Sequence, residues 1–344
     1  LPEQARAPRH QGQEEARPAD GKDLFSSMPP LEAFKTAISL LTSRQKSSRG
    51  KPFKLAFFDI SRAHFYGKLD REVYGELPDE LKQQYGYDKV AKLKKSWYGL
   101  QDASNIWQKD YTELLEEHGH RRGRSNGAIF YNAGNDSRTL CHGDDFCVLG
   151  DEDAIGDFED ALRKKYTHKK LAILGFERGD DRHAVFLNRV LTVDASERPH
   201  RITYEPDARR AQLLIREHGL EKASGAETPA EHRSVDKQIL DSKIALLSVE
   251  MKSRFRSCVM RAAYLAQDDP SIAEAVKSLA RRMSSPNEAD YQILKRLGRF
   301  LIKYPMTANP FPIQNMYDTI KVYVDTDHAG CALTRKSTTG LAVL

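Results

Sequence analysis

Three aspartate residues in two distant segments of the chain could together bind divalent metal ions. Asp144 and Asp145 are consecutive and lie between two short apolar runs, and Asp59 ends another apolar run far upstream. Carboxylates at strand ends are hard oxygen ligands suited to Mg²⁺, and two such ions about 3.5–4 Å apart stabilise the attacking and leaving oxygens of a phosphoryl transfer. The pattern therefore predicts a two-metal site, provided that the fold brings Asp59 close to Asp144.

Each segment also has a purely structural interpretation. The sequence Gly143-Asp144-Asp145 is typical of a hairpin turn, and Asp59 alone could be a strand-end or helix-cap residue. The tryptophan and tyrosine residues Trp97, Tyr98 and Trp107 are expected in the core rather than in stacking contacts with bases. His118, His120, His142 and Cys141 lack the repeating spacing of a transition-metal site.

The composition favours an intracellular protein of two or three domains. The chain has 344 residues, a formal net charge of +5 and four cysteines without a CxxC pair, so neither zinc nor a disulfide framework is indicated. No apolar run reaches the roughly 18 residues of a membrane span, and no signal-peptide core is present, so a soluble protein that is not secreted is expected. Basic residues are clustered, which fits either a nucleic-acid track or solvated helix faces. The clusters are Lys92, Lys94 and Lys95; Arg121, Arg122 and Arg124; Arg163, Lys164 and Lys165; and Arg281, Arg282, Lys295, Arg296 and Arg299.

Hydrophobic periodicity in the first half predicts a sheet backed by helices. Residues 1–28 are polar and are expected to be disordered. A helix is predicted from Leu31 to Leu41, strands over 53–59 and 72–77, and a helix over 103–115 that Gly119 ends. A hairpin is predicted around 128–131, followed by the strands that flank the Asp-Asp turn and by a helix capped by Asp153.

The second half is predicted to be mainly helical. Residues 184–204 should form a ribbon of two strands, 206–219 a helix, and the polar stretch 224–243 a linker. Ser271 and Glu274 have the spacing of a capping box at the start of a helix, and a second helix is expected over 291–301. A final strand over 320–324 should end in Asp325.

A series of motifs in a fixed order resembles the reverse transcriptase of copia-type LTR retrotransposons, which is part of a Pol polyprotein. The resemblance runs from about Pro29 to the end of the chain. It includes "FFDISRAHFYG" (57–67), "EVYGELPDE" (72–80), "KLKKSWYGLQDASNIW" (92–107), "HGDDFCVLG" (142–150), "TP" (228–229), "AAYLAQDDPSIAEAV" (262–276), "KRLGRFLIKYP" (295–305), and "VYVDTDHAG" (322–330) with "TRKSTTG" (334–340).

The resemblance implies an α+β fold: a polymerase palm made of an antiparallel sheet backed by helices, partial fingers, a helical connection region and a truncated ribonuclease H-like strand. The implied divisions are a disordered tail at 1–28, fingers and palm at 29–223, a linker at 224–243, a helical thumb or connection at 244–312 and the start of a ribonuclease H-like domain at 313–344.

The resemblance also implies roles for individual residues. Asp59, Asp144 and Asp145 would be catalytic and would bind two Mg²⁺ ions, with Mn²⁺ as a substitute. The nucleotide-binding residues would be Ile60, Ser61, Arg62 and Ala63 along the triphosphate, His64 against the sugar, and Tyr98 and Gly99 in the pocket. Lys92, Lys94 and Lys95 would lie near nucleic-acid phosphates, and Asp325 would be a ribonuclease H remnant.

The implied function is RNA-directed DNA polymerisation, in which dNTPs extend a DNA primer on an RNA template or within an RNA/DNA hybrid. Ribonuclease H activity is not expected. Two family positions differ, because His64 replaces a phenylalanine or tyrosine and His142-Gly143 replaces Tyr-Val, and residues 1–28 do not resemble the basic fingers segment. Two alternatives remain: a non-catalytic nucleic-acid-binding remnant of a decayed element, which would not extend a primer, and a metal nuclease, which would shorten one.

Overall fold

The computed structural model describes residues 24–196, 198–207, 209–230, 244–305, 308–315, 319–330 and 335–343. The greater parts of the predicted tail and linker, 1–23 and 231–243, lie outside these ranges. The predicted tail extended to residue 28, but the structure holds its last residues against a helix: the Ser27 amide donates to Gln108 Oε1 (2.9 Å), and Asn105 donates to the Phe25 carbonyl (2.8 Å).

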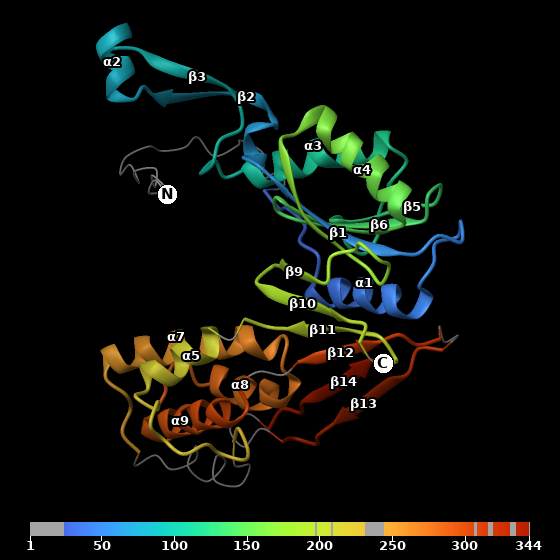
Figure 1. The fold of residues 1–344 in the computed structure, drawn as a ribbon. Coiled ribbons are helices and arrows are strands. Elements are labelled where there is room, and N and C mark those ends of the chain that lie inside the picture. Colours follow the sequence, from blue (N-terminus) through green and yellow to red (C-terminus); the bar gives the residue numbers. More distant parts are fainter. Residues whose placement is uncertain are drawn as a thin grey trace.

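An antiparallel six-stranded sheet forms the centre of the upper half of the molecule (Figure 1). Its strand order is β4 (Arg121–Arg122), β5 (Ile129–Asn132), β6 (Ser137–His142), β7 (Asp145–Gly150), β1 (Lys54–Ile60) and β8 (His168–Leu174). The prediction of an α+β fold with antiparallel sheets is confirmed. The long β1 is the key element, because it pairs with β7 on one side and β8 on the other.

Helices α3 (Ala103–Glu117) and α4 (Glu152–Lys165) cover one face of this sheet (Figure 1). Phe58 on β1, Trp107 on α3 and Phe158 on α4 are buried together in one core. Each such side chain contributes about 1.5–3 kcal/mol on burial. The predicted α4 cap was wrong: Asp151, not Asp153, accepts the hydrogen bond from the Ala154 amide (3.0 Å).

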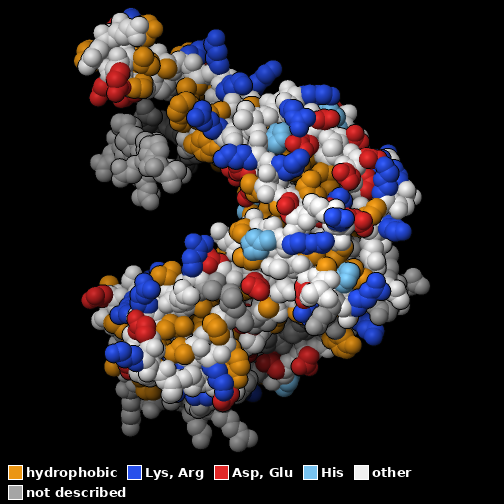
Figure 2. Space-filling model, in the orientation of Figure 1, with side chains coloured by type: hydrophobic (Ala, Val, Ile, Leu, Met, Phe, Trp, Pro, Cys, Tyr) orange, Lys and Arg blue, Asp and Glu red, His pale blue; other side chains and the backbone are white. Residues whose placement is uncertain are grey.

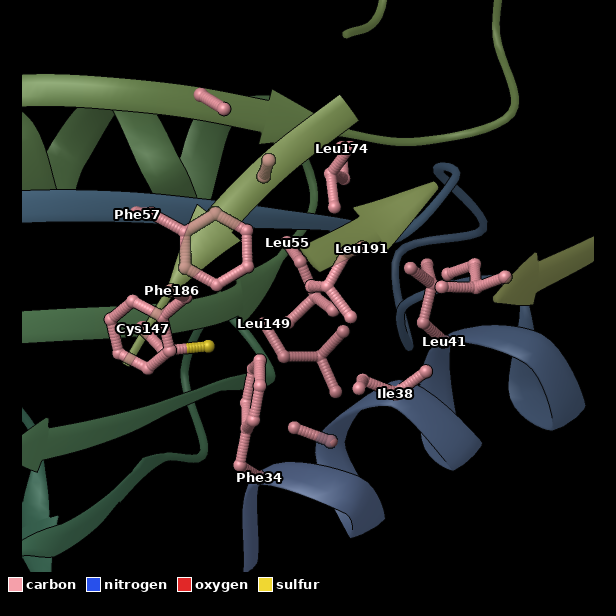
Figure 3. Close-up of a cluster of buried hydrophobic side chains, with 14 of the residues drawn as sticks. Phe34, Ile38, Leu41, Leu55, Phe57, Cys147, Leu149, Leu174, Phe186 and Leu191 are labelled. Carbon is pink, nitrogen blue, oxygen red and sulfur yellow. The ribbon is translucent and has the colours of Figure 1, made fainter. Parts of the chain in front are cut away.

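Helix α1 (Leu31–Arg44) and a second antiparallel sheet cover the other face. This sheet has the order β12 (Asn309–Pro312), β11 (Arg201–Glu205), β10 (Arg189–Asp194) and β9 (His183–Phe186). Figure 3 shows Phe34 of α1 pointing toward Phe57 and Phe186, whose ring centroids lie 6.1 and 5.0 Å from its own. The predicted two-stranded ribbon was therefore wrong, because residues 183–205 supply three strands and β12 adds a fourth.

A projecting arm leaves the sheet after the short helix η1 (Ala63–Phe65). The arm consists of β2 (Lys68–Glu76), α2 (Asp79–Tyr85) and β3 (Val90–Lys95), with β2 and β3 paired antiparallel. It extends away from the six-stranded sheet at the top of Figure 1. No residue of α2 is buried, so the base of the arm is the part that contacts the rest of the protein.

A helical unit with its own core forms the lower half of the molecule. It contains α5 (Arg209–Glu217), α7 (Val249–Ala266), η2 (Pro270–Ile272), α8 (Ala273–Ala280) and α9 (Glu288–Lys303). The predicted Ser271–Glu274 box was wrong, since the Asp269 side chain accepts from the Ser271 amide (3.0 Å), whereas Asn287 and Asp290 form a capping box on α9. Helix α5 packs in the core of this helical unit. The predicted division after residue 223 had instead grouped this helix with the strands that precede it.

The hairpin of β13 (Val322–Thr326) and β14 (Thr339–Val343) forms a separate two-stranded sheet. Figure 2 shows that the molecule is deeply hollowed between the arm and the helical unit. The end of the six-stranded sheet that joins the arm therefore borders an open space. Among the described helices, none is long and apolar enough to cross a membrane.

Candidate active site

Asp59 and Asp145 lie directly opposite each other on neighbouring strands. The antiparallel register of β1 and β7 pairs Phe57 with Cys147 and Asp59 with Asp145. Directly opposed residues of an antiparallel pair project from the same face, with Cβ atoms about 4.5–5.5 Å apart. Phe57 and Cys147 belong to the core beneath α1. The two carboxylates lie on that same face of the sheet, two residues further along each strand.

Asp144 completes the group from the tight turn between β6 and β7. His142 and Asp145 pair across the hairpin, so Gly143 and Asp144 form a two-residue loop. Gly143 has a φ of +66°, while Asp144 does not have a positive φ, as in a type II′ turn. Two hydrogen bonds fix the loop: the Ile60 amide donates to the Asp144 carbonyl (2.9 Å), and Trp107 Nε1 donates to the Gly143 carbonyl (2.8 Å).

The three carboxylates influence each other electrostatically. Partial burial and, to a lesser extent, the charges of Asp144 and Asp59 together raise the pKa of Asp145 to about 6. Among the described residues, no three His, Cys, Asp or Glu side chains form a ready metal cage. Mg²⁺ is usually held by one or two carboxylates together with waters and substrate phosphates, so such a cage is not a requirement for this ion.

The segment after Asp59 turns sharply at the edge of the site. The amides of Ile60 and Ser61 already donate to the carbonyls of Asp144 and Thr167, both at 2.9 Å. Arg62 adopts a left-handed conformation (φ 60°, ψ 43°) and begins η1. The backbone amides of Arg62 and Ala63 donate no hydrogen bond to another described residue. Of residues 60–63, these two therefore have N–H groups that are free to donate to a phosphate.

His64, Tyr98 and Gly99 lie together beside the carboxylates. The rings of His64 and Tyr98 are stacked, with centroids 4.5 Å apart and planes inclined by 24°. Burial lowers the pKa of the His64 imidazole, and the charge of Asp144 opposes this shift. Burial also raises the pKa of Tyr98, with Asp144 and Asp59 adding to the effect. Gly99, with φ +103°, provides the turn that leads into α3.

The three predicted phosphate-binding lysines lie on β3 and have different surroundings. Lys92 forms an ion pair with Glu72 on β2 and lies over the Tyr74 ring. Lys95 lies at the base of the arm, with Nζ 5.6 Å from the centroid of the Tyr66 ring, and Lys94 beside it is exposed. Lys94 and Lys95 are therefore closer to the site along the arm than Lys92, whose charge is already paired.

Asp325 belongs to a different part of the molecule. It lies on β13, exposed, opposite Gly340 of β14. That sheet shares no strand with the sheet that carries Asp59 and Asp145. The structure thus brings Asp59, Asp144, Asp145, His64 and Tyr98 together and leaves Asp325 outside.

Two aromatic residues differ from the sequence-based expectation. Trp107 is in the core as predicted, but its bond to the Gly143 carbonyl also makes it a support of the aspartate turn. Trp97 and Tyr98 were expected in the core, yet they are 50% and 45% exposed. The only sequence signal was their position directly after the basic strand, which places them at the base of the arm.

Comparison with known proteins shows which family matches the part of the chain that carries this site. The family described as "Reverse transcriptase (RNA-dependent DNA polymerase)" matches residues 24–182, a range that contains all three aspartates of the site. This part of the chain is therefore a reverse transcriptase domain.

The relatives identify the subgroup. The chain is 22% identical over 339 residues to the retrovirus-related Pol polyprotein from transposon TNT 1-94 of Nicotiana tabacum, covering 96% of this chain and 24% of the relative. It is 24% identical over 293 residues to the Pol polyprotein from transposon RE2 of Arabidopsis thaliana, covering 83% and 18% respectively. An uncharacterized mitochondrial protein of Arabidopsis thaliana is 35% identical over 101 residues, or 29% of this chain and 42% of that protein.

These relatives confirm the resemblance to copia-type Pol polyproteins. The chain spans about a quarter or less of the length of the two Pol polyproteins.

Proposed function

We propose that this protein extends a primer 3′-hydroxyl with dNTPs on an RNA template. The observation that carries the proposal is the register of β1 and β7, which sets Asp59 opposite Asp145 and fixes Asp144 in the adjoining turn. Residues that are far apart in the sequence thus supply three neighbouring carboxylates, at the end of the sheet from which the arm leaves. The reverse transcriptase match over the same residues supports this interpretation.

The donor set suits divalent cations. Oxygen ligands are those that Mg²⁺ and Mn²⁺ prefer, and burial together with the charges of Asp144 and Asp59 raises the pKa of Asp145, with no cation of the described residues opposing this rise. Asp59, Asp144 and Asp145 would hold the ions. When bound, a pair of ions would lower the pKa of the 3′-hydroxyl and stabilise the leaving pyrophosphate.

The protein's own residues would position the reactants. Hydrogen bonds from Trp107 and Ile60 fix the backbone of the aspartate turn, which would limit the reorganisation needed when ions bind there. The amides of Arg62 and Ala63 would donate to the triphosphate, and the His64–Tyr98 stack would form the wall beside the sugar. Catalysis would consist mainly of positioning and charge neutralisation, since phosphoryl transfer requires no protein nucleophile.

Primer extension tests the proposal. A labelled DNA primer annealed to an RNA template, with dNTPs and Mg²⁺, should be lengthened by the wild-type protein. Asp144→Asn should reduce the rate by at least about 100-fold, as for other groups that stabilise developing charge. Asp157→Asn, which changes an exposed carboxylate on α4, is the matched control and should extend normally.

The other outcomes select the alternatives. Binding of the hybrid by wild-type protein without any extension would identify a non-catalytic nucleic-acid-binding protein. A primer that becomes shorter in an Asp144-dependent manner would identify a nuclease.

A further inference from the structure

A short segment of the chain, residues 224–228, lies along helix α9 and contains neither helix nor strand. We call this segment the strap. The Ala226 amide donates to the Arg299 carbonyl of α9 (3.0 Å), and the Ala226 side chain is buried. Gly225 permits this close approach, because a Cβ atom at that position would lie 2.8 Å from the Cβ atom of Lys303. The backbone of the strap is thus held against α9.

Two arginines of α9 donate hydrogen bonds to hydroxyl-bearing residues of the strap. Arg296 Nη2 donates to the Thr228 hydroxyl oxygen (3.0 Å). The Arg299 guanidinium donates to both the carbonyl and the hydroxyl of Ser224 (2.8 and 3.0 Å). Guanidinium groups carry planar sets of donors that match the oxygens of a phosphate group. Donors suited to an anion therefore already contact neutral oxygens of the strap.

The acidic residue of the strap is itself neutralised. Glu227 forms an ion pair with Lys303 and accepts a hydrogen bond from the Tyr304 hydroxyl (3.1 Å). Its carboxylate therefore opposes a second negative charge on the neighbouring Thr228 only weakly. A new anion on the Thr228 hydroxyl oxygen would lie next to the guanidinium of Arg296.

The sequence after Thr228 indicates how such an anion could arise. Only Thr228 and Ser285, among all serines and threonines of the chain, are followed by a proline. Thr228 is exposed and lies outside the helices, and Pro229 favours an extended conformation at Thr228. By contrast, the Ser285 amide donates to the Arg282 carbonyl (3.1 Å) in a tight turn, and Pro286 is buried. A protein kinase that requires a proline after its acceptor can therefore reach Thr228 more easily.

We propose that Thr228 is a phosphorylation site for a proline-directed protein kinase, and that the phosphate fastens the strap to α9 through Arg296. The Thr228 hydroxyl oxygen would attack the γ-phosphorus of ATP. A new O–P bond forms, the bond between this phosphorus and the bridging oxygen of ADP breaks, and the hydroxyl proton passes to a base of the kinase.

The physical effect follows from the charge and the oxygens that the phosphate adds. A phosphothreonine carries a charge of about −1.5 to −2 and three strong acceptor oxygens, and opposite arginine it forms about one to three charge-assisted hydrogen bonds. Such bonds are shorter and stronger than the present bond from Arg296 to a neutral hydroxyl. The strap should therefore separate from α9 less often.

Peptide mapping and hydrogen exchange test the two parts of the inference. The full chain is incubated with ATP, Mg²⁺ and a purified cyclin-dependent kinase, a class that requires proline after the acceptor. Phosphate should be found on Thr228; Ser285→Ala should leave incorporation unchanged, and Thr228→Ala should abolish it. After removal of the kinase and addition of a chelator, the Ala226 amide should exchange about 10-fold more slowly in the phosphorylated chain than in the unmodified chain.

The role of Arg296 is tested by comparing the gain in protection between variants. Arg296→Gln should accept phosphate on Thr228 but gain little of this protection, because the guanidinium is absent. Arg163→Gln, which changes an exposed arginine on α4, is the matched control and should gain as much protection as the wild type. The gain should also shrink at high salt, since exposed charges are screened.

The inference is overturned if peptide mapping finds no phosphate on Thr228, or finds it only on Ser285. It is also overturned if phosphorylation leaves the exchange of the Ala226 amide unchanged or makes it faster, or if Arg296→Gln gains as much protection as the wild type. Primer extension is not used in any of these measurements, so the result is independent of the proposed polymerase.

Discussion

Asp59 and Asp145 face each other across β1 and β7, so two like charges are opposed on one face of the sheet. Opposed like charges destabilise a strand pair by roughly 0.2–1 kcal/mol. Asp145→Asn should therefore increase the unfolding free energy at pH 7 by an amount in this range. Such a loss of stability in favour of function is expected wherever negative charge is held ready for a cation.

Two measurements extend this prediction. Because the pKa of Asp145 is raised from 3.8 to about 6 in the folded state, the folded state binds the proton more tightly than the unfolded state, and the stability that protonated Asp145 contributes is lost as pH rises from about 4 through 6. The advantage of Asp145→Asn should thus grow between pH 5 and 7. Mg²⁺ should raise the melting temperature of the wild type and of Asp157→Asn but not of Asp145→Asn. Equal Mg²⁺ shifts in all three would contradict the assignment.

A buried ion pair links the second sheet to the helical unit. Asp268, in the turn after α7, accepts hydrogen bonds from Arg189 of β10 (3.0 and 3.1 Å) and from the Tyr204 hydroxyl of β11 (2.6 Å). Both charged side chains are almost fully buried. Arg189→Met, which leaves the Asp268 charge without its main partner, should cost about 3–5 kcal/mol of unfolding free energy.

Denaturant titration measures this cost. Asp153→Asn removes one charge from the exposed Lys51–Asp153 pair and is the matched control; it should change stability by no more than about 1 kcal/mol. The double variant Arg189→Met with Asp268→Leu should recover part of the loss, because no uncompensated buried charge remains. A loss for Arg189→Met as small as that of the control would show that the pair does not hold the two units together.

Acid should destabilise the protein through His120, which is buried between α3 and the sheet. Burial lowers the pKa of His120 from 6.5 to about 4, so between these values the unfolded state binds the proton more readily. The contribution of neutral, buried His120 to stability is therefore complete above pH 6.5 and is lost as pH falls toward 4, by up to about 3 kcal/mol. Thermal unfolding of His120→Leu should depend less on pH over this interval than that of the wild type or of exposed His183→Gln.

Local patterns were sufficient to predict the elements that hold the aspartates. The apolar residues Phe57 and Phe58 are buried on opposite faces of β1, as period-two alternation requires. Gly143 marked the turn correctly, because few other residues adopt its conformation. These features predict each segment of the site. The approach of Asp59 to Asp144 could only be stated as a condition, and its register opposite Asp145 was not predicted, because both depend on a contact between distant strands.

Non-local packing accounts for the features that the sequence did not reveal. The edge strand β12 pairs with β11 across about a hundred residues, and nothing in the local pattern of Asn309–Pro312 specifies this partner. The exposure of Trp97 depends in the same way on the course of the arm, since propensity places a tryptophan in the core. The cap of α4 was ambiguous because Asp151 and Asp153 are both acidic residues at the helix start.

His64 offers a test of sugar selection within the proposed polymerase. Its ring stacks on Tyr98, and its buried Nδ1 has no hydrogen-bond partner among the described residues, so His64→Phe should fold without losing a polar contact. The larger phenyl ring should exclude a ribose 2′-hydroxyl more effectively. The ratio of kcat/KM for a deoxynucleotide to that for the matching ribonucleotide should rise about 10- to 100-fold, the range for one small group in a pocket.

The comparison with His64→Ala decides whether ring size is the cause. That variant removes the wall, so its ratio should fall below the wild-type value, and the order of selectivity should be Phe, then His, then Ala. His183→Gln, on the edge strand β9, should leave the ratio unchanged. An identical ratio in all three residues at position 64 would place the sugar elsewhere. Since that result would leave primer extension intact, it would correct the position of the nucleotide without rejecting the carboxylate site.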